Sequence, residues 1–349
     1  MSNATGTPVR AGIVGLGRSG WSIHARAMEA MPEKFQVAAV TDVDPQRREE
    51  AKHHFGCRTH ESFESLIADE ELDLVVVASP SQLHGGQSIA AMQAGHDVLC
   101  EKPFALSSEE ADRVIEVSKR TGRMIAPFQN RRYEATFQQV KSVIDSGILG
   151  RIVMARIAAH SFKRRWDWQT LKRFGGGSLN NTGPHFIDQA LEVFGPGEPE
   201  VFCILDRTVS LGDADDHVKL VLHGQGHPSV EVEITSASPY SQDQWLVMGT
   251  CGGLRGGGKG LEWQWIDPRQ LPERELDVNP TPDRSYNKEE LDWHSDSWTP
   301  DPDNAVPIDQ QAYQDLYRTL REGMPLTVTP ESVRRQIAVI ERCHEMSPV

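Results

Sequence analysis

The sequence has few cysteines, and they are scattered. Its five cysteines stand singly at positions 57, 100, 203, 251 and 343, with no Cys-x-x-Cys pair among 349 residues. This spacing argues against a disulfide framework and against a zinc knuckle, and it is typical of a reducing compartment. We therefore expect no metal site.

The chain also lacks an excess of positive charge and lacks long apolar runs. Its net charge is −14 and its sequence pI is about 5.4, which disfavours nucleic acids and anionic membranes as partners. The apolar run 72–78 is far too short to cross a bilayer, and residues 1–10 lack the apolar core of a signal peptide. These features predict a cytoplasmic protein.

Residues 1–128 alternate short apolar segments with helical patterns. The expected strands are rich in valine, isoleucine and alanine and are apolar on both faces, as buried parallel strands are; they span 10–16, 36–43, 72–79, 96–101 and 123–128. Helix-start signals stand between them at Asp44-Pro45, at Ser81 and at Ser107-Ser108. Repeated βαβ units predict a doubly wound α/β domain, a Rossmann fold.

From residue 129 to 349 the pattern predicts an α+β domain. A helix over 134–146 precedes segments that alternate apolar and polar residues and indicate a mainly antiparallel sheet with one face covered, at 151–159, 217–223, 229–237, 245–250 and 261–266. The glycine-rich stretch 251–260 lacks the Gly-Lys-Ser/Thr ending of a phosphate loop, so we expect a wide turn. The polar stretch 267–307 is expected as an ordered lid or a partly mobile surface loop. Helices follow near 310–322 and 330–346, and the last is a candidate to pack back on the first domain.

A glycine-rich turn lies between the first expected strand and the helix after it. The pattern Gly15-x-Gly17-x-x-Gly20 permits a tight turn, a close approach of a pyrophosphate and close helix packing. Asp42 ends the next strand and would accept hydrogen bonds from ribose hydroxyls while repelling a 2′-phosphate, which favours NAD over NADP. The alternative is a tight turn without a ligand. The predicted cofactor-binding residues here are Gly15, Leu16, Gly17, Arg18, Ser19, Gly20 and Asp42.

Lys102 is the first candidate for acid–base chemistry. It follows the fourth expected strand in Glu101-Lys102-Pro103, and ligands of open α/β sheets bind at the carboxyl ends of strands. Near a nicotinamide cation the pKa of this lysine would fall into a range useful for proton exchange. The alternative is a surface Glu–Lys pair.

The stretch GGGSLNNTGPHFID, residues 175–188, is the second candidate. In a helix starting near residue 181, Asn181, His185 and Asp188 would share one face, and His185 would be a base with a pKa near neutrality. The alternative makes Asn181 a helix cap, His185 a buried hydrogen-bonded residue and Asp188 a surface charge.

Together these segments resemble the glucose-fructose oxidoreductase, inositol dehydrogenase and rhizopine-catabolism family (Gfo/Idh/MocA). The resemblance rests on segments in family order over nearly the whole chain: GIVGLGRSGW, VTDVDPQR, VVVASPSQLH, CEKPFALSSEEA, FQNRRYE, GGGSLNNTGPHFIDQALEVFG and GMPLTVTPESVRRQIAVIE. It implies hydride exchange between a nicotinamide cofactor and a hydroxyl carbon of a sugar or cyclitol. It also implies an open sheet in the second domain, often buried in a homodimer or homotetramer.

The resemblance assigns roles residue by residue. Lys102 and His185 match the family's catalytic lysine and histidine, and further matches line the cofactor or substrate: Ser79, Pro80, His84, Glu101, Asn130 and Arg131. For His84, an ordinary helix histidine is an equal alternative. Asn181 stands where the family usually has an aspartate. An amide cannot take a proton but can position a hydroxyl or a ring, so Asn181 is expected to position, His185 to take the hydroxyl proton, and Lys102 to hydrogen-bond the oxygen.

The segment 161–174 is expected to bind the substrate. Tryptophan rings can cover the C–H face of a sugar and arginine can bind its hydroxyls, so Trp166 is the preferred contact, with Arg164 and Trp168 as weaker ones. The alternative is one tryptophan in the core and solvated basic residues. The leading hypothesis is an NAD-dependent sugar or polyol dehydrogenase; the alternatives are a non-catalytic NAD-binding regulator and a redox-neutral, NAD-dependent glycoside-cleaving enzyme.

Overall fold

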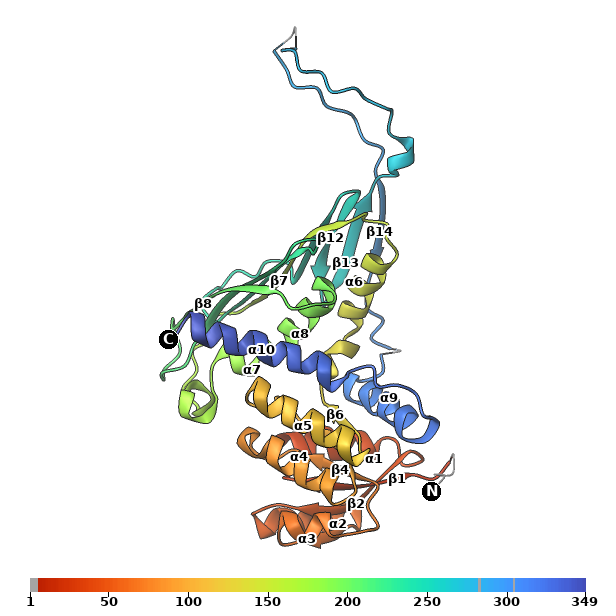
Figure 1. Ribbon diagram of the computed structural model, residues 1–349, viewed down its shortest axis with the longest axis vertical. Coiled ribbons are helices and arrows are strands. Elements are labelled where there is room, and N and C mark those ends of the chain that lie inside the picture. Colours follow the sequence, from red (N-terminus) through yellow and green to blue (C-terminus); the bar gives the residue numbers. More distant parts are fainter. Residues whose placement is uncertain (1–5, 282–283, 304) are drawn as a thin grey trace.

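Two sheets organise the chain. The computed structural model describes residues 6–281, 284–303 and 305–349, and its two sheets lie one above the other, with the first part of the chain at the bottom of Figure 1. Within the described residues no helix is long and apolar enough to cross a membrane. Residues 1–5 of the segment that lacks a signal-peptide core lie outside these ranges. So do three positions of the expected lid or surface loop 267–307, namely 282, 283 and 304.

The first sheet is parallel and has the strand order β3-β2-β1-β4-β5-β6. Its strands are β1 (Val9–Val14), β2 (Phe35–Thr41), β3 (Arg58–His60), β4 (Leu74–Val77), β5 (Asp97–Cys100) and β6 (Ile125–Pro127). β1 pairs in parallel with both β2 and β4, so the chain reverses its winding beside β1. This order confirms the predicted Rossmann fold; β3, only three residues long and not apolar, was not predicted.

Helices cover both faces of this sheet. They are η1 (Gly20–Ala25, π-helical) running into α1 (Arg26–Glu29), α2 (Pro45–Phe55), α3 (Phe63–Ile67), η2 (Ser81–Leu83) running into α4 (His84–Gln93), and α5 (Ser108–Thr121). The start signals read from the sequence are confirmed at two of them. Asp44 accepts a hydrogen bond from the Gln46 N–H at 2.9 Å, and Ser107 accepts one from the Glu110 N–H at 3.1 Å.

The second sheet is mainly antiparallel, as predicted, in the order β14-β13-β12-β11-β7-β10-β9-β8. Its strands are β7 (Ile152–His160), β8 (Glu200–Asp206), β9 (His217–His223), β10 (Ser229–Thr235), β11 (Trp245–Gly249), β12 (Gly252–Gly257), β13 (Gly260–Trp265) and β14 (His294–Trp298). Only β10 and β7 pair in parallel among these strands. β8 and β14 were not predicted.

The expected wide turn at 251–260 is wrong. Residues 252–257 form β12, which pairs with β11 and β13. Glycines weaken a strand pattern in the sequence, but here they make room for large neighbours: a Cβ on Gly252 would lie 2.2 Å from the Gln264 carbonyl oxygen and 2.9 Å from Trp265 Cβ. The glycines of β12 form a strand because the large residues of the neighbouring strand β13 pack against them, which the sequence does not show.

The remaining helices lie between and beside the sheets. They are η3 (Asn130–Tyr133), α6 (Ala135–Asp145), η4 (Trp168–Thr170), η5 (Lys172–Phe174), α7 (Ser178–Asn181), α8 (Gly183–Phe194), η6 (Pro268–Gln270), α9 (Ile308–Glu322) and α10 (Pro330–Met346). α10 packs against α5, which covers the first sheet, and against α8 and β8 of the second part of the chain, so it contacts both halves of the molecule (Figure 1). Tyr313 of α9 and Ile337 of α10 belong to the apolar clusters of the first sheet.

Candidate active site at the strand ends of the first sheet

The glycine turn has the shape of a phosphate cradle. Gly15 has φ of 90°, and a Cβ on it would lie 2.8 Å from the Ala78 carbonyl oxygen. A Cβ on Gly20 would lie 1.8 Å from the Gly15 carbonyl oxygen, so this glycine is required for packing. Gly17, by contrast, has nothing within 4 Å of where its Cβ would lie. The open space beside Gly17 fits a cofactor pyrophosphate.

Asp42 is buried and fixes the cradle. Its Oδ2 accepts a hydrogen bond from the Leu16 N–H at 2.6 Å, and its Oδ1 accepts one from the Asp44 N–H at 2.9 Å. Each carboxylate oxygen keeps a further acceptor site for a ribose hydroxyl. Around it, the Leu16 side chain is buried in the core, Ser19 is partly buried and Arg18 is exposed.

His84 acts as a brace between two loops. It is buried, and its Nδ1 and Nε2 lie 2.7 Å from the carbonyl oxygens of Pro103 and Ser79. Burial lowers the pKa of His84, but Cys100 and the two carbonyls outweigh this and raise it to about 9. Because both ring nitrogens are engaged by backbone carbonyls, the structure favours the alternative of an ordinary positioning histidine, and a contact of His84 with the cofactor stays a prediction. Ser79 itself adjoins Gly15, while Pro80 is exposed.

Glu101 is a buried carboxylate rather than half of a surface pair. Its Oε1 lies 3.3 Å from His24 Nε2, and its Oε2 accepts a hydrogen bond from the Lys102 N–H at 2.9 Å. Burial would raise the pKa of Glu101, but the hydrogen bond and charge of His24 hold it at about 2. His24 Nδ1 in turn lies 2.8 Å from the Tyr313 hydroxyl of α9. This chain of contacts fixes the backbone from which the Lys102 side chain extends; His24 and Tyr313 were not predicted.

Lys102 and the Asn181 backbone meet between the two sheets. Lys102 Nζ donates a hydrogen bond to the Asn181 carbonyl oxygen at 3.0 Å. Burial lowers the pKa of Lys102; Glu101 opposes this, and the charges of Arg131 and Arg18 add to the lowering. Lys102 therefore has an ammonium that releases its proton more readily than an exposed lysine.

His185 is a neutral imidazole, which corrects the expectation of a pKa near neutrality. Burial lowers the pKa of His185 to about 3, and the charges of Lys102 and Arg131 contribute. Its Nδ1 is buried and makes no hydrogen bond within the described part of the chain. The Glu101 carboxylate opposes these two charges only in part. An amide at position 181 cannot offset them as a carboxylate could.

The helix expected to start near residue 181 is confirmed as α8, but Asn181 lies outside it and does not share its face with His185 and Asp188. α7 ends at Asn181, and α8 begins at Gly183 with Pro184 in its first turn. Asp188 is not a surface charge: it is buried, and its two oxygens accept hydrogen bonds from Arg132 at 2.7 and 2.8 Å. This ion pair connects α8 to η3. Arg131 and Arg132 are adjacent in the sequence, and no local pattern shows that Arg132 is the buried one.

The Asn130 side chain, predicted to contact the cofactor, is bound to α9 in the structure. Its Nδ2 donates a hydrogen bond to Asp309 of α9 at 2.7 Å. Its neighbour Gln129, which was not predicted, is buried and donates to the Pro184 carbonyl oxygen at 3.1 Å and to Gln336 at 2.8 Å. Gln129 thereby holds the first turn of α8, and with it His185, against α10.

The predicted substrate residues of segment 161–174 do not join this group. Trp166 is 76% exposed, and Trp168 is 60% exposed with its ring against Phe174. Arg164 is exposed as well. Neither tryptophan lies in the core, so that part of the alternative is wrong, whereas the exposed Arg164 fits its solvated basic residues; the substrate contacts of this segment stay predictions.

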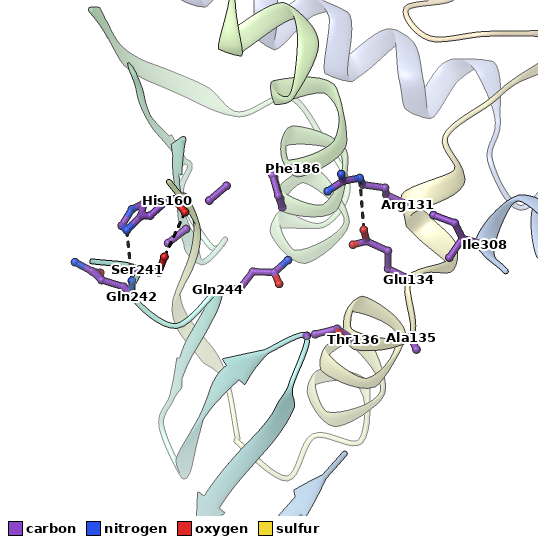
Figure 2. Close-up of a pocket in the computed structure, with 13 residues that line it drawn as sticks. Arg131, Glu134, Ala135, Thr136, His160, Phe186, Ser241, Gln242, Gln244 and Ile308 are labelled. Carbon is purple, nitrogen blue, oxygen red and sulfur yellow. Dashed lines mark hydrogen bonds and ion pairs between the residues drawn. The ribbon is translucent and has the colours of Figure 1, made fainter. Parts of the chain in front are cut away.

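A cavity of about 510 Å³ opens beside Arg131 and the α8 residue Phe186 (Figure 2). The Arg131 guanidinium lies over the Phe186 ring at 5.6 Å, and Arg131 Nε is 3.5 Å from Glu134. The other wall holds further polar side chains, none of them predicted from the sequence: His160, Ser241, Gln242 and Gln244. Such a lining, with apolar and hydrogen-bonding groups, suits a small polar molecule.

Comparison with known proteins identifies the family. Residues 9–128 match the model of the oxidoreductase family with an NAD-binding Rossmann fold, and residues 137–255 match the GFO/IDH/MocA C-terminal domain. The chain belongs to the Gfo/Idh/MocA family. This membership confirms the resemblance drawn from the motifs and confirms NAD as the expected cofactor.

Relatives within the Gfo/Idh/MocA family include inositol dehydrogenases. The chain is 34% identical to inositol 2-dehydrogenase 2 of Saccharopolyspora erythraea, over 66% of this chain and 68% of that protein. It is 25% identical to the NADP⁺-dependent scyllo-inositol 2-dehydrogenase of Bacillus subtilis, over 97% and 94%. Among solved structures, the WlbA dehydrogenase of Bordetella pertussis, in complex with NADH and UDP-GlcNAcA, has a TM-score of 0.79 at 20% identity, covering 99% of this chain and 96% of that one. These similarities establish an oxidoreductase with the family fold.

Proposed function

We propose that the protein is an NAD-dependent dehydrogenase that oxidises a secondary hydroxyl of a cyclitol, a sugar or a sugar derivative. The observation that carries this proposal is the Lys102 ammonium, which is held 3.0 Å from the Asn181 carbonyl oxygen and whose charge lowers the pKa of His185. Asp42 supports a preference for NAD over NADP, because its carboxylate would repel a 2′-phosphate.

Lys102 and His185 have different roles in the proposed proton transfer. NAD bound at the glycine turn would accept the hydride. A base works best when its pKa lies near the working pH, so Lys102, with a lowered pKa, takes the hydroxyl proton better than His185, whose pKa is about 3. The neutral His185 ring then hydrogen-bonds the substrate oxygen and orients it. This assignment exchanges the roles expected from the sequence.

The cavity beside Arg131 supports a polyol substrate. Arg131 borders the cavity, and its charge lowers the pKa of both Lys102 and His185; these two residues do not line the cavity themselves, but Phe186, the residue after His185, does. Its hydrogen-bonding walls suit several hydroxyl groups at once, and the names of the inositol dehydrogenase relatives point to the same substrate class.

The test is NADH formation with NAD or NADP, between pH 7 and 10, across inositols, aldoses, sugar acids and glycosides. We expect turnover with NAD that falls about 10²–10⁴-fold in Lys102→Ala, because a positioned proton acceptor is removed. NAD binding, followed by fluorescence, should persist. Lys119→Ala, at an exposed pair with Glu331, is the matched control and should keep full activity.

Three results would each overturn part of this proposal. Unchanged turnover in Lys102→Ala would remove Lys102 from the chemistry. NAD binding without NADH formation on any substrate would favour a regulator, and cleavage of a glycoside without net NADH would favour redox-neutral chemistry.

A further inference from the structure

A long arm projects from the second sheet. We define the arm as residues 271–293, which connect β13 to β14; its described parts, 271–281 and 284–293, extend away from the rest of the molecule (Figure 1). Arg274 on one leg pairs with Glu289 on the other at 2.5 Å, and the root is fixed because the Trp265 and His294 rings stack at 5.5 Å. The arm is thus anchored to the sheet but otherwise reaches into solvent.

The arm carries apolar side chains that nothing in its own chain covers. Leu276, Val278 and Tyr286 are 90%, 82% and 93% exposed. The sequence of the arm holds seven acidic and three basic residues, a net charge of −4. Exposed apolar groups in a polar, charged frame are typical of an interaction surface.

A second surface of the same chain has the opposite charge. The basic loop, which we define as residues 161–174, holds five basic residues and one acidic residue, a net charge of +4. Its exposed rings are those of Phe162, Trp166, Trp168 and Phe174. Among the described residues, Arg165 is paired with Asp167, whereas Lys163 and Lys172 have no ion-pair partner.

The arm cannot reach the basic loop of its own chain. The basic loop packs on the connection between β8 and β9, where the Lys172 N–H donates to Asp213 at 2.8 Å and the Leu211 N–H donates to the Arg165 carbonyl oxygen. The loop starts where β7 ends, and β13, three strands away through antiparallel pairs, ends at the opposite end of the sheet; the far part of the loop lies at the β8 edge, six strand spacings or roughly 30 Å from β13. The arm also points away from that edge (Figure 1).

We propose that the arm of one copy docks on the basic loop of a second copy of this chain. The acidic residues of the arm face the lysines and arginines of the loop, and the arm's apolar side chains pack against the loop's aromatic rings. Since the loop leads into Gly175 and α7, this contact joins the arm of one copy to the segment that precedes Asn181 in the next.

Cross-linking in mixed samples tests the contact. Light and ¹⁵N-labelled protein, mixed, allowed to exchange and treated with a carbodiimide, should give links from arm carboxylates such as Glu275 and Glu290 to Lys163 or Lys172. We expect about half of these links to join a light to a heavy peptide. Links only within one isotope after exchange, or no arm–loop links, would overturn the proposal.

Charge reversal provides a second, independent test. Glu275→Lys with Glu290→Lys reverses the arm, and Lys163→Glu with Arg173→Glu reverses the loop; all four positions are exposed, so the fold should persist. Each double variant alone should associate at least ten-fold more weakly than the parent in sedimentation at low salt, and an equimolar mixture of the two should recover association. A mixture no better than its components would overturn the proposal, as would variants that associate like the parent.

Discussion

At the scale of single residues, burial sets the charge state of His185. Burial and the charges of Lys102 and Arg131 lower the pKa of His185, the Glu101 carboxylate only partly opposes them, and the amide of Asn181 adds no further negative charge, so the imidazole stays neutral. A neutral ring can donate or accept a hydrogen bond at any physiological pH, but it is a weak base. Under the proposed function, Lys102 rather than His185 therefore takes the hydroxyl proton.

The low pKa of His185 predicts a pH dependence of stability. Since the pKa is about 3 when folded and 6.5 when unfolded, the unfolded chain binds more protons between these values. The free energy of unfolding should therefore fall as the pH drops from 6.5 to 3, with a contribution from His185 of about 1.4 kcal/mol per pH unit at most. Denaturant titrations at several pH values measure this slope.

Two variants separate the His185 contribution from that of other groups. His185→Asn should reduce the slope, and Asn181→Asp should reduce it in part because an added carboxylate raises the pKa of His185. A slope that stays the same in His185→Asn would show that His185 is not held neutral in the folded protein.

At the scale of elements, the turn from β1 into η1 uses three glycines for three different reasons. Gly15 supplies a positive φ, Gly20 allows the turn and helix to touch, and Gly17 leaves space. Only Gly17 could be replaced without a clash inside the protein. Binding and folding can therefore be separated by substitution at this turn.

We predict that Gly17→Ala keeps its stability and loses NAD affinity, whereas Gly20→Ala loses stability. The added methyl at Gly17 meets no protein atom but enters the space for the pyrophosphate, and NAD affinity should fall at least ten-fold. The methyl at Gly20 would clash with the Gly15 carbonyl, at a cost of about 1–3 kcal/mol. Titration with NAD and thermal unfolding measure the two effects.

Gly86→Ala is the matched control for this pair. Its methyl would also have open space, and it lies in α4, away from the turn. It should leave NAD affinity unchanged and stability equal or slightly higher. If Gly17→Ala bound NAD as tightly as the parent, the cofactor would not pass beside Gly17.

At the scale of the whole molecule, the C-terminal helices join the two halves. Tyr313 of α9 is fully buried among residues of the first sheet, and its hydroxyl is the outer member of the chain through His24 to Glu101. α10 carries Gln336, which holds Gln129 beside the first turn of α8. The two halves of the candidate site are thus positioned by helices that follow both sheets in the chain.

Tyr313→Phe should lower the free energy of unfolding by about 1–3 kcal/mol, because it leaves a buried nitrogen of His24 without its partner. Chemical denaturation measures the change. Tyr317→Phe on the same helix is the control and should be near neutral, since that partly buried ring contributes packing against Phe35. Equal effects of the two substitutions would mean that the Tyr313 hydroxyl contributes nothing specific.

The outward face of the second sheet predicts self-association. Phe202 and Ile204 on β8 are 49% and 48% exposed, and Met248 on β11 is 42% exposed, on the face opposite the helices. We propose a homodimer or homotetramer formed through this face. Phe202→Glu with Ile204→Glu should lower the molar mass measured by light scattering, while Glu200→Lys, an exposed charged position on the same strand, should not.

The sequence by itself determined the Rossmann fold, the mainly antiparallel second sheet, the family and the cofactor. These depend on local signals: apolar runs of strand length, helix caps such as Asp44 and Ser107, and a glycine turn followed by Asp42. Each can be read within a few residues because backbone geometry and hydrogen bonding impose it locally.

Only the tertiary structure decided the charge states and partners within the site. The pKa of His185, the occupied ring nitrogens of His84, the turning of Asn130 toward Asp309 and the exposure of Trp166 all depend on residues distant in the chain. β12 likewise became a strand because Trp265 and its neighbours pack against glycines. Burial and Coulomb interactions arise from three-dimensional proximity, which no local pattern of residues encodes.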